Sequence, residues 1–226
     1  MRVYTRKEKF LNWLHYNKLW VAAVALVIWV AGSMLWNVLG IGQTEPDCRF
    51  LYVGSRPLSE DCIAALEAGL ASLAEDYNGD GTVAVTVTQC VTVSSTSIDN
   101  QMYGYGSEIA VLADITEGES TFFLLEDPVA FQLSFQILAY PDGSIPAEDD
   151  FTALDKVYLW KNCPALASLE LGMYEDKFLD LTETGEIQDL LSGLYLGRRY
   201  FFDPGRQKNP HADNALWNVM TEGATQ

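Results

Sequence analysis

The 226-residue chain is acidic and rich in apolar residues, with 49% hydrophobic residues, 31 Asp+Glu against 14 Lys+Arg, and two histidines. This composition excludes an intrinsically disordered chain. Two histidines, His15 and His211, are too few for a three-histidine zinc site. The formal net charge of −17 argues against a nucleic-acid partner, because the phosphate backbone would be repelled.

The N-terminal 42 residues differ in charge from the rest of the chain. They hold five basic residues and one acidic residue, whereas residues 43–226 hold nine basic and 30 acidic residues. Residues 19–39 carry no charge, and as a helix they span roughly 30 Å, the thickness of a bilayer's hydrocarbon core. We therefore predict a basic cytoplasmic tail at 1–18 and a transmembrane helix at 19–39, with the C-terminal domain outside the cell membrane.

A cleaved signal peptide is the alternative interpretation of this segment, since Ala31-Gly32-Ser33 offers the small residues that a signal peptidase accepts. The apolar run is longer than the usual hydrophobic region of a signal peptide and continues past Ser33 through Trp36. An uncleaved single-pass anchor is therefore preferred. No lipid anchor is expected, because serine follows the small residues where a lipoprotein has cysteine.

Residues 40–47 are a short Gly- and Pro-containing linker, and residues 48–226 are enough for one domain with a real core. On the exported side disulfides can persist, but four cysteines allow three pairings, and their spacing matches no metal knuckle. Disulfide pairing and buried free thiols both remain open. The cysteines are Cys48, Cys62, Cys90 and Cys163.

Strand-like and helix-like segments alternate through the first half of the domain. Strands are predicted at 50–53, 83–88 and 120–125, separated by helical spacing over 60–77 and 107–112. Ser59 and Asp127 are expected to cap helices. This order predicts an α/β fold of three layers, with a mostly parallel sheet and helices on both faces. In the second half we expect helices at 151–160 and 209–221 and a returning strand within 192–202.

The order of four strand and helix segments resembles the first lobe of type 2 periplasmic (extracellular) solute-binding proteins. These segments are FLYVGSRPLSED, VAVTV, SEIAVLADITEGE and STFFLLEDPVAF. Gly118-Glu119 is similar to the Gly-Asp turn that precedes the central strand in that family. The block KEKFLNWLHYNKLW also resembles uncharacterised single-pass membrane proteins of Gram-positive anaerobes that display such a domain. The resemblance implies one lobe of the solute-binding fold. About 180 exported residues are too few for two lobes, so a trap that closes around its ligand is not expected.

No sequence motif indicates catalysis, because the chain lacks G-x-S-x-G, G-x-x-x-x-G-K, H-E-x-x-H and C-x-x-C. His211 is the only exported imidazole and is expected at a surface or helix start. We therefore predict a non-catalytic, membrane-anchored binding or interaction domain, whose small-molecule ligand the sequence does not identify. The alternative is a structural or assembly subunit of a cell-envelope complex, with an envelope protein as partner.

One loop has metal-ligand spacing. Asp76, Asn78 and Asp80 occupy positions 1, 3 and 5 of a calcium-type loop, glycine is at position 6, and the carbonyl of Thr82 is at position 7. These residues make Ca²⁺ the one candidate cofactor. Position 12, where an EF-hand requires glutamate, is Val87. The alternative is a tight turn whose polar side chains bind local backbone amides.

Overall fold

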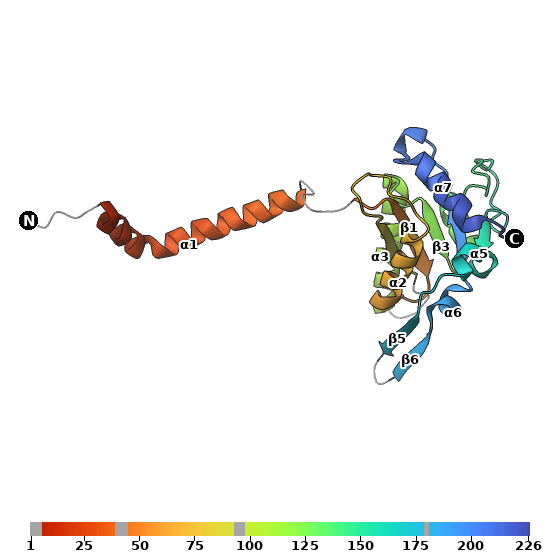
Figure 1. Cartoon of the computed structure of the whole chain (residues 1–226), viewed down its shortest axis with the longest axis horizontal. Helices are drawn as coiled ribbons and strands as arrows, with labels where there is room; N and C mark the ends of the chain where they lie inside the picture. The colour runs from red at the N-terminus through yellow and green to blue at the C-terminus, as the bar shows by residue number, and fades with distance from the viewer. Residues whose placement is uncertain (1–5, 39–44, 93–97, 179–180) are drawn as a thin grey trace, which may run out of the picture. The chain divides into compact units, whose positions relative to one another are not determined.

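The computed structural model describes residues 6–38, 45–92, 98–178 and 181–226. The chain divides into two units, Met1–Thr44 and Glu45–Gln226 (Figure 1). Each unit is described by itself below.

The N-terminal unit contains one long helix, α1 (Arg6–Val38), interrupted at Asn17, whose φ of −108° and ψ of 15° are not helical. The side chain of Asn17 donates a hydrogen bond from Nδ2 to the carbonyl of Trp13 (2.9 Å). Within the described residues, Trp13–Met34 is the stretch long and apolar enough to cross a membrane. Large apolar side chains such as Ile28 (66% exposed) point outward, which suits a helix surrounded by lipid.

The second unit is built on a five-stranded sheet of order β2-β1-β3-β7-β4 (Figure 1). β1 pairs in parallel with both β2 and β3, whereas β7 pairs antiparallel with both β3 and β4. The strands are β1 (Cys48–Gly54), β2 (Val85–Val91), β3 (Phe122–Leu125), β4 (Val157–Leu159) and β7 (Tyr195–Arg198).

The sheet is mixed, so the prediction of a mostly parallel sheet is confirmed only in part. Four strands point the same way and β7 alone runs against them, so both of its pairings are antiparallel. The backbone N–H of Trp160, at the end of β4, donates to the carbonyl of Leu194 just before β7 (2.8 Å). Because this contact places the start of β7 where β4 ends, β7 can only run back along the sheet.

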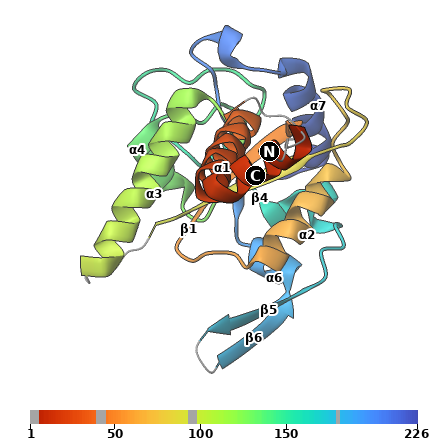
Figure 2. The same cartoon turned by 90° about the vertical axis from the view of Figure 1, so that its left-hand side faces the viewer.

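Helices cover both faces of the sheet, so the predicted α/β character and layering are confirmed (Figure 2). Side chains alternate along β1, with Phe50 and Tyr52 in one apolar core and Leu51 and Val53 in the other. The first core packs against α2 (Glu60–Ala71), α5 (Pro164–Ala167), α6 (Ile187–Leu191) and α7 (Pro210–Thr221). The second packs against α3 (Ile98–Glu117) and α4 (Pro128–Phe135).

Both predicted helix caps are confirmed. The hydroxyl of Ser59 accepts a hydrogen bond from the backbone N–H of Cys62 (3.3 Å) at the start of α2. The carboxylate of Asp127 accepts from the N–H groups of Val129 (3.1 Å) and Ala130 (2.9 Å) at the start of α4. These bonds satisfy amides that have no partner within the helix.

The second half departs further from the prediction. The helix expected at 151–160 is a loop followed by β4 and the short 3-10 turn η1 (Trp160–Asn162). A separate hairpin projects away from the main sheet (Figures 1 and 2). Its strands are β5 (Met173–Phe178) and β6 (Leu181–Glu186). The closing helix α7 is confirmed, and a further 3-10 turn, η2 (Pro204–Arg206), precedes it.

Candidate functional site

A groove of about 1000 Å³ lies between α3 and α4, beyond the carboxyl ends of β1, β2 and β3. Gly54 ends β1, Thr92 follows β2, and Glu126 follows β3. We refer to this cavity as the switch-point groove. It is lined by Val53, Gly54, Ser55, Thr92, Glu108, Ile109, Val111, Leu112, Glu126, Asp127, Ala130, Phe131, Ser134 and Phe135.

The strand order explains why a groove forms at this edge of the sheet. The chain leaves β1 through α2 to reach β2 on one side, and then passes through α3 to reach β3 on the other side of β1. The two connecting helices pack on opposite faces of the sheet. A crevice opens where such connections diverge, and open α/β sheets bind ligands there, outside the carboxyl ends of the strands.

Polar residues at the ends of the three strands form the floor of the groove, and hydrogen bonds between them hold this floor together. The carboxylate of Glu126 accepts from the backbone N–H of Ser55 (2.5 Å) and from its hydroxyl (2.9 Å). The backbone N–H of Glu126 donates to the carbonyl of Val53 (3.0 Å), and that of Thr92 donates to Gly54 (2.8 Å). Three segments that are far apart in sequence therefore form one organised edge.

Gly54 is needed at this floor for a steric reason. A β-carbon at this position would collide with the phenol ring of Tyr52 and approach the Glu126 carboxylate to 3.1 Å. The Tyr52 hydroxyl donates to the carbonyl of Arg56 (2.9 Å), which holds the ring in place. Burial, and secondarily the negative charge of Glu126, raise the pKa of Tyr52 to about 12, so this phenol stays protonated at neutral pH.

The walls of the groove carry apolar side chains from both helices. On α3, Ile109 and Leu112 are 67% and 56% exposed. On α4, the Phe131 ring lies 5.0 Å from Phe123 of β3 and 5.1 Å from Phe135. The aromatic row anchors α4 on the sheet, while the two aliphatic side chains of α3 remain available to an occupant.

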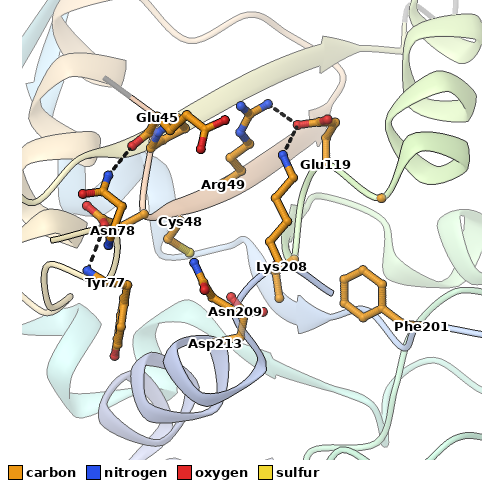
Figure 3. A pocket seen from close by; sticks show the side chains of 14 residues that line it. Glu45, Cys48, Arg49, Tyr77, Asn78, Glu119, Phe201, Lys208, Asn209 and Asp213 are labelled. Atoms are coloured by element: carbon orange, nitrogen blue, oxygen red, sulfur yellow. Dashed lines mark hydrogen bonds and ion pairs between the residues drawn. The ribbon is translucent and has the colours of Figure 1, made fainter. Parts of the chain in front are cut away.

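A second cavity, of about 420 Å³, lies at the opposite, amino-terminal edge of β1 and β3 (Figure 3). Figure 3 shows Arg49 and Lys208 directed at the Glu119 carboxylate. Arg49 forms an ion pair with Glu119, and the Lys208 ammonium lies 3.8 Å from the same carboxylate. The basic groups of this cavity are therefore already paired with a carboxylate that lines it.

Asp47 supplies a second structural contact in this cavity. Its carboxylate accepts from the backbone N–H groups of Tyr77 (2.9 Å), Asn78 (3.1 Å) and Ala84 (2.8 Å). Burial opposes ionisation, but the three N–H donors outweigh it and lower the pKa of Asp47 below its usual value. Asp47 thus fastens the segment before β2 to the start of β1, and we assign this cavity a structural role.

The predicted calcium loop lies between α2 and β2. The Asp76 carboxylate accepts from the N–H groups of Gly79 (2.7 Å) and Gly81 (2.9 Å). The Asn78 side chain accepts from Asp80 (2.8 Å), and Asp80 accepts from the N–H of Thr82 (2.8 Å). The tight-turn alternative accounts for these bonds, and calcium binding stays a prediction for Asp76, Asn78, Asp80 and Thr82.

All four cysteines are buried and free, as the alternative of buried thiols requires. Burial raises the pKa of Cys62 and of Cys163 to about 11, and it also raises the pKa of Cys48 and of Cys90. A protonated, buried thiol is a poor nucleophile. The structure therefore assigns these cysteines to packing.

The sequence interpretation missed the polar residues of the switch-point groove. Ser55, Thr92 and Glu126 each follow the end of a strand, and that position was the available signal. It is a weak one, because many strands end in polar residues. Asp127, which the sequence predicted as a helix cap, also lines this groove at the start of α4.

Comparisons of this chain with protein-family models, curated proteins and solved structures find no match.

Proposed function

We propose that the chain is a single-pass membrane protein whose C-terminal domain lies outside the cell and binds a ligand, without catalysis, in the switch-point groove. The observation that carries the proposal is the position of this groove at the carboxyl ends of β1, β2 and β3, where a polar floor meets apolar walls. Ligand sites in α/β folds combine these properties.

The domain corresponds in this proposal to one lobe of a solute-binding fold. Supporting it are the parallel core β2-β1-β3 and the helices on both faces. All of the residues that line the groove belong to this one domain, and a groove that does not enclose its ligand is expected to bind it weakly.

A non-catalytic role is favoured by the residues available in the groove. Among the described residues that line it, none is cysteine, histidine or lysine. Ser55 is the hydroxyl nearest to a base, but its partner Glu126 already accepts from both the hydroxyl and the backbone N–H of Ser55. This pairing organises the floor and leaves no separate group to orient the base.

The proposed location rests on α1 and on charge. Trp13–Met34 can cross a membrane, and the basic residues before it favour a cytoplasmic N-terminus. Protease added to intact protoplasts should digest the domain from about Asp47 onward and leave the N-terminal tail protected. Protection of the whole chain would refute this orientation.

The alternative, an assembly subunit of an envelope complex, is favoured by the hairpin β5–β6. The hairpin forms its own two-stranded sheet and projects from the domain (Figure 1). A two-stranded sheet has two unpaired edges, to which a strand of another protein can add.

A groove-filling variant separates the two functions. Ala130 is exposed on α4 and lines the groove, so Ala130→Trp should block it. Ala64→Trp, on the exposed side of α2, adds the same ring outside the groove. Both variants are purified as full-length chains after cross-linking in intact cells, and bound molecules are compared by mass spectrometry.

Molecules lost from Ala130→Trp and retained by Ala64→Trp support binding in the groove. A third variant lacks residues 173–186. If both tryptophan variants retain the same molecules and only the deletion loses them, the result supports the assembly role and overturns the groove proposal.

A further inference from the structure

Carboxylates line the switch-point groove on both of its walls. Glu108 is on α3, Glu126 follows β3, and Asp127 begins α4. No lysine or arginine is among the described residues that line it. This distinguishes the groove from the second cavity, where Arg49 and Lys208 neutralise Glu119. The switch-point groove therefore carries negative charge that its own lining does not balance.

The Glu126 carboxylate is held in place but retains binding capacity. Its two oxygens accept from Ser55, whereas an ionised carboxylate offers about four acceptor sites. The hydrogen bonds from Ser55 also fix the rotamer, so a cation can bind with little further loss of side-chain freedom. Glu126 is exposed, and a ligand can reach it from solvent.

Apolar surface lies beside this charge. Ile109 and Leu112 are one helical turn apart on α3 and more than half exposed. Together with Phe131 and Phe135 of α4 they line the groove. Covering Ile109 and Leu112 with an apolar partner would remove apolar area from water, which is favourable.

From these observations we propose that the groove binds a peptide segment that carries both apolar side chains and a lysine or arginine. The proposal rests on the proposed function and adds the class of ligand. The volume of about 1000 Å³ is at the upper end of small-molecule sites and accommodates several side chains. The apolar walls favour leucine-like residues, and the three carboxylates select a cationic partner over an acidic one.

Binding of matched synthetic peptides tests the class of ligand. The first probe is a labelled 14-residue amphipathic peptide of leucine and lysine. The second has glutamate at every lysine position, and the third has serine at every leucine position. Fluorescence anisotropy is measured with the full-length chain in zwitterionic nanodiscs, and empty nanodiscs supply the background.

Only the leucine–lysine peptide should bind, with an affinity that falls as salt is raised. Equal binding of the serine–lysine peptide overturns the proposal, because it means that charge alone attracts peptides to this acidic domain. Preference for the leucine–glutamate peptide overturns it as well.

Variants assign the binding to the groove. Glu108→Gln/Glu126→Gln removes two carboxylates and should weaken binding of the leucine–lysine peptide about threefold or more. Leu112→Gln should weaken it to a similar extent and should not unfold the domain, since Leu112 is more than half exposed. The control Glu75→Gln/Glu170→Gln removes two exposed carboxylates outside the groove and should bind like the unmodified chain.

The outcomes separate this inference from the proposed function. If Leu112→Gln weakens binding of a neutral or acidic apolar peptide, the groove is a binding site and only the charge preference is wrong. If neither groove variant differs from the control with any probe, and Ala130→Trp retains the molecules bound in cells, both proposals fail.

Discussion

Gly197 lies in the middle of β7, paired with Phe123 of β3 and with Val157 of β4. A β-carbon added at this position would lie 2.9 Å from Cδ2 of Leu138 and 3.2 Å from Cγ1 of Val157. Both neighbours are buried, Leu138 at 0% and Val157 at 2% exposure. The single reversed strand can therefore insert between β3 and β4 because one of its residues has no side chain.

Gly197→Ala should destabilise the domain by about 1–3 kcal/mol, the usual cost of an extra methyl group in a packed core. For a domain of this size, each kcal/mol corresponds to roughly 2–4 °C, so the melting temperature should fall by about 2–12 °C. Gly193→Ala is the matched control, since a β-carbon there meets no atom within 4 Å. That variant should be neutral, or stabilising by up to about 1 kcal/mol, through a less flexible unfolded chain.

Thermal unfolding of the full-length protein in mild detergent, followed by near-ultraviolet circular dichroism, measures the difference between the two variants. Buried tryptophans such as Trp160 and Trp217 supply the signal. Equal melting temperatures for Gly197→Ala and Gly193→Ala would refute the packing described for β7.

Three further predictions concern the rest of the domain. The native protein at pH 8 should react with less than one equivalent of a thiol reagent and with four equivalents when denatured, because burial keeps the thiols protonated; rapid labelling of the native protein would contradict this. Asp47→Asn should lower the free energy of unfolding at pH 7. Because the folded pKa of Asp47 lies below its unfolded value of about 3.9, the stability from its ionised form is present above pH 4 and is lost as the pH falls through the folded pKa. The difference from the unmodified chain in urea titrations should therefore shrink in acid, and a difference independent of pH would count against the role of the charge. Finally, calcium titration should raise the melting temperature, and Asp76→Ala or Asp80→Ala should abolish the rise; no shift at several millimolar calcium would leave this loop a tight turn.

The sequence alone was sufficient for the features that depend on near neighbours in the chain. The uncharged run at 19–39 predicts a helix long enough to cross a membrane, and α1 contains the apolar stretch Trp13–Met34. Ser59 and Asp127 mark the starts of α2 and α4, because a cap binds amides two or three residues away. The apolar runs at β1 and β3 predict strands, because short apolar runs bounded by turn residues are typical of buried strands.

Local patterns also misled the prediction. Apolar residues at 151, 154 and 158 have helical spacing, but residues 151–156 form a loop held by a buried ammonium group, and residue 158 lies in β4. Lys156 is fully buried; its Nζ lies 2.9 Å from the Asp150 carboxylate and donates to the carbonyl of Thr152 (2.6 Å). The Tyr140 hydroxyl donates to the same carboxylate (2.5 Å). The buried ammonium group is therefore paired by residues of its own loop and by Asp150, and the spacing of the apolar residues gives no sign of this pairing.

The tertiary structure decided the direction of β7 and the composition of the candidate site. Strand direction depends on where the preceding segment ends in space, and the contact between Trp160 and Leu194 joins residues 34 positions apart. The groove likewise joins Ser55, Thr92 and Glu126, which come together only when three parallel strands are in register. Short-range periodicity carries no information on such pairings, because the contacts that determine them form between segments distant in the chain.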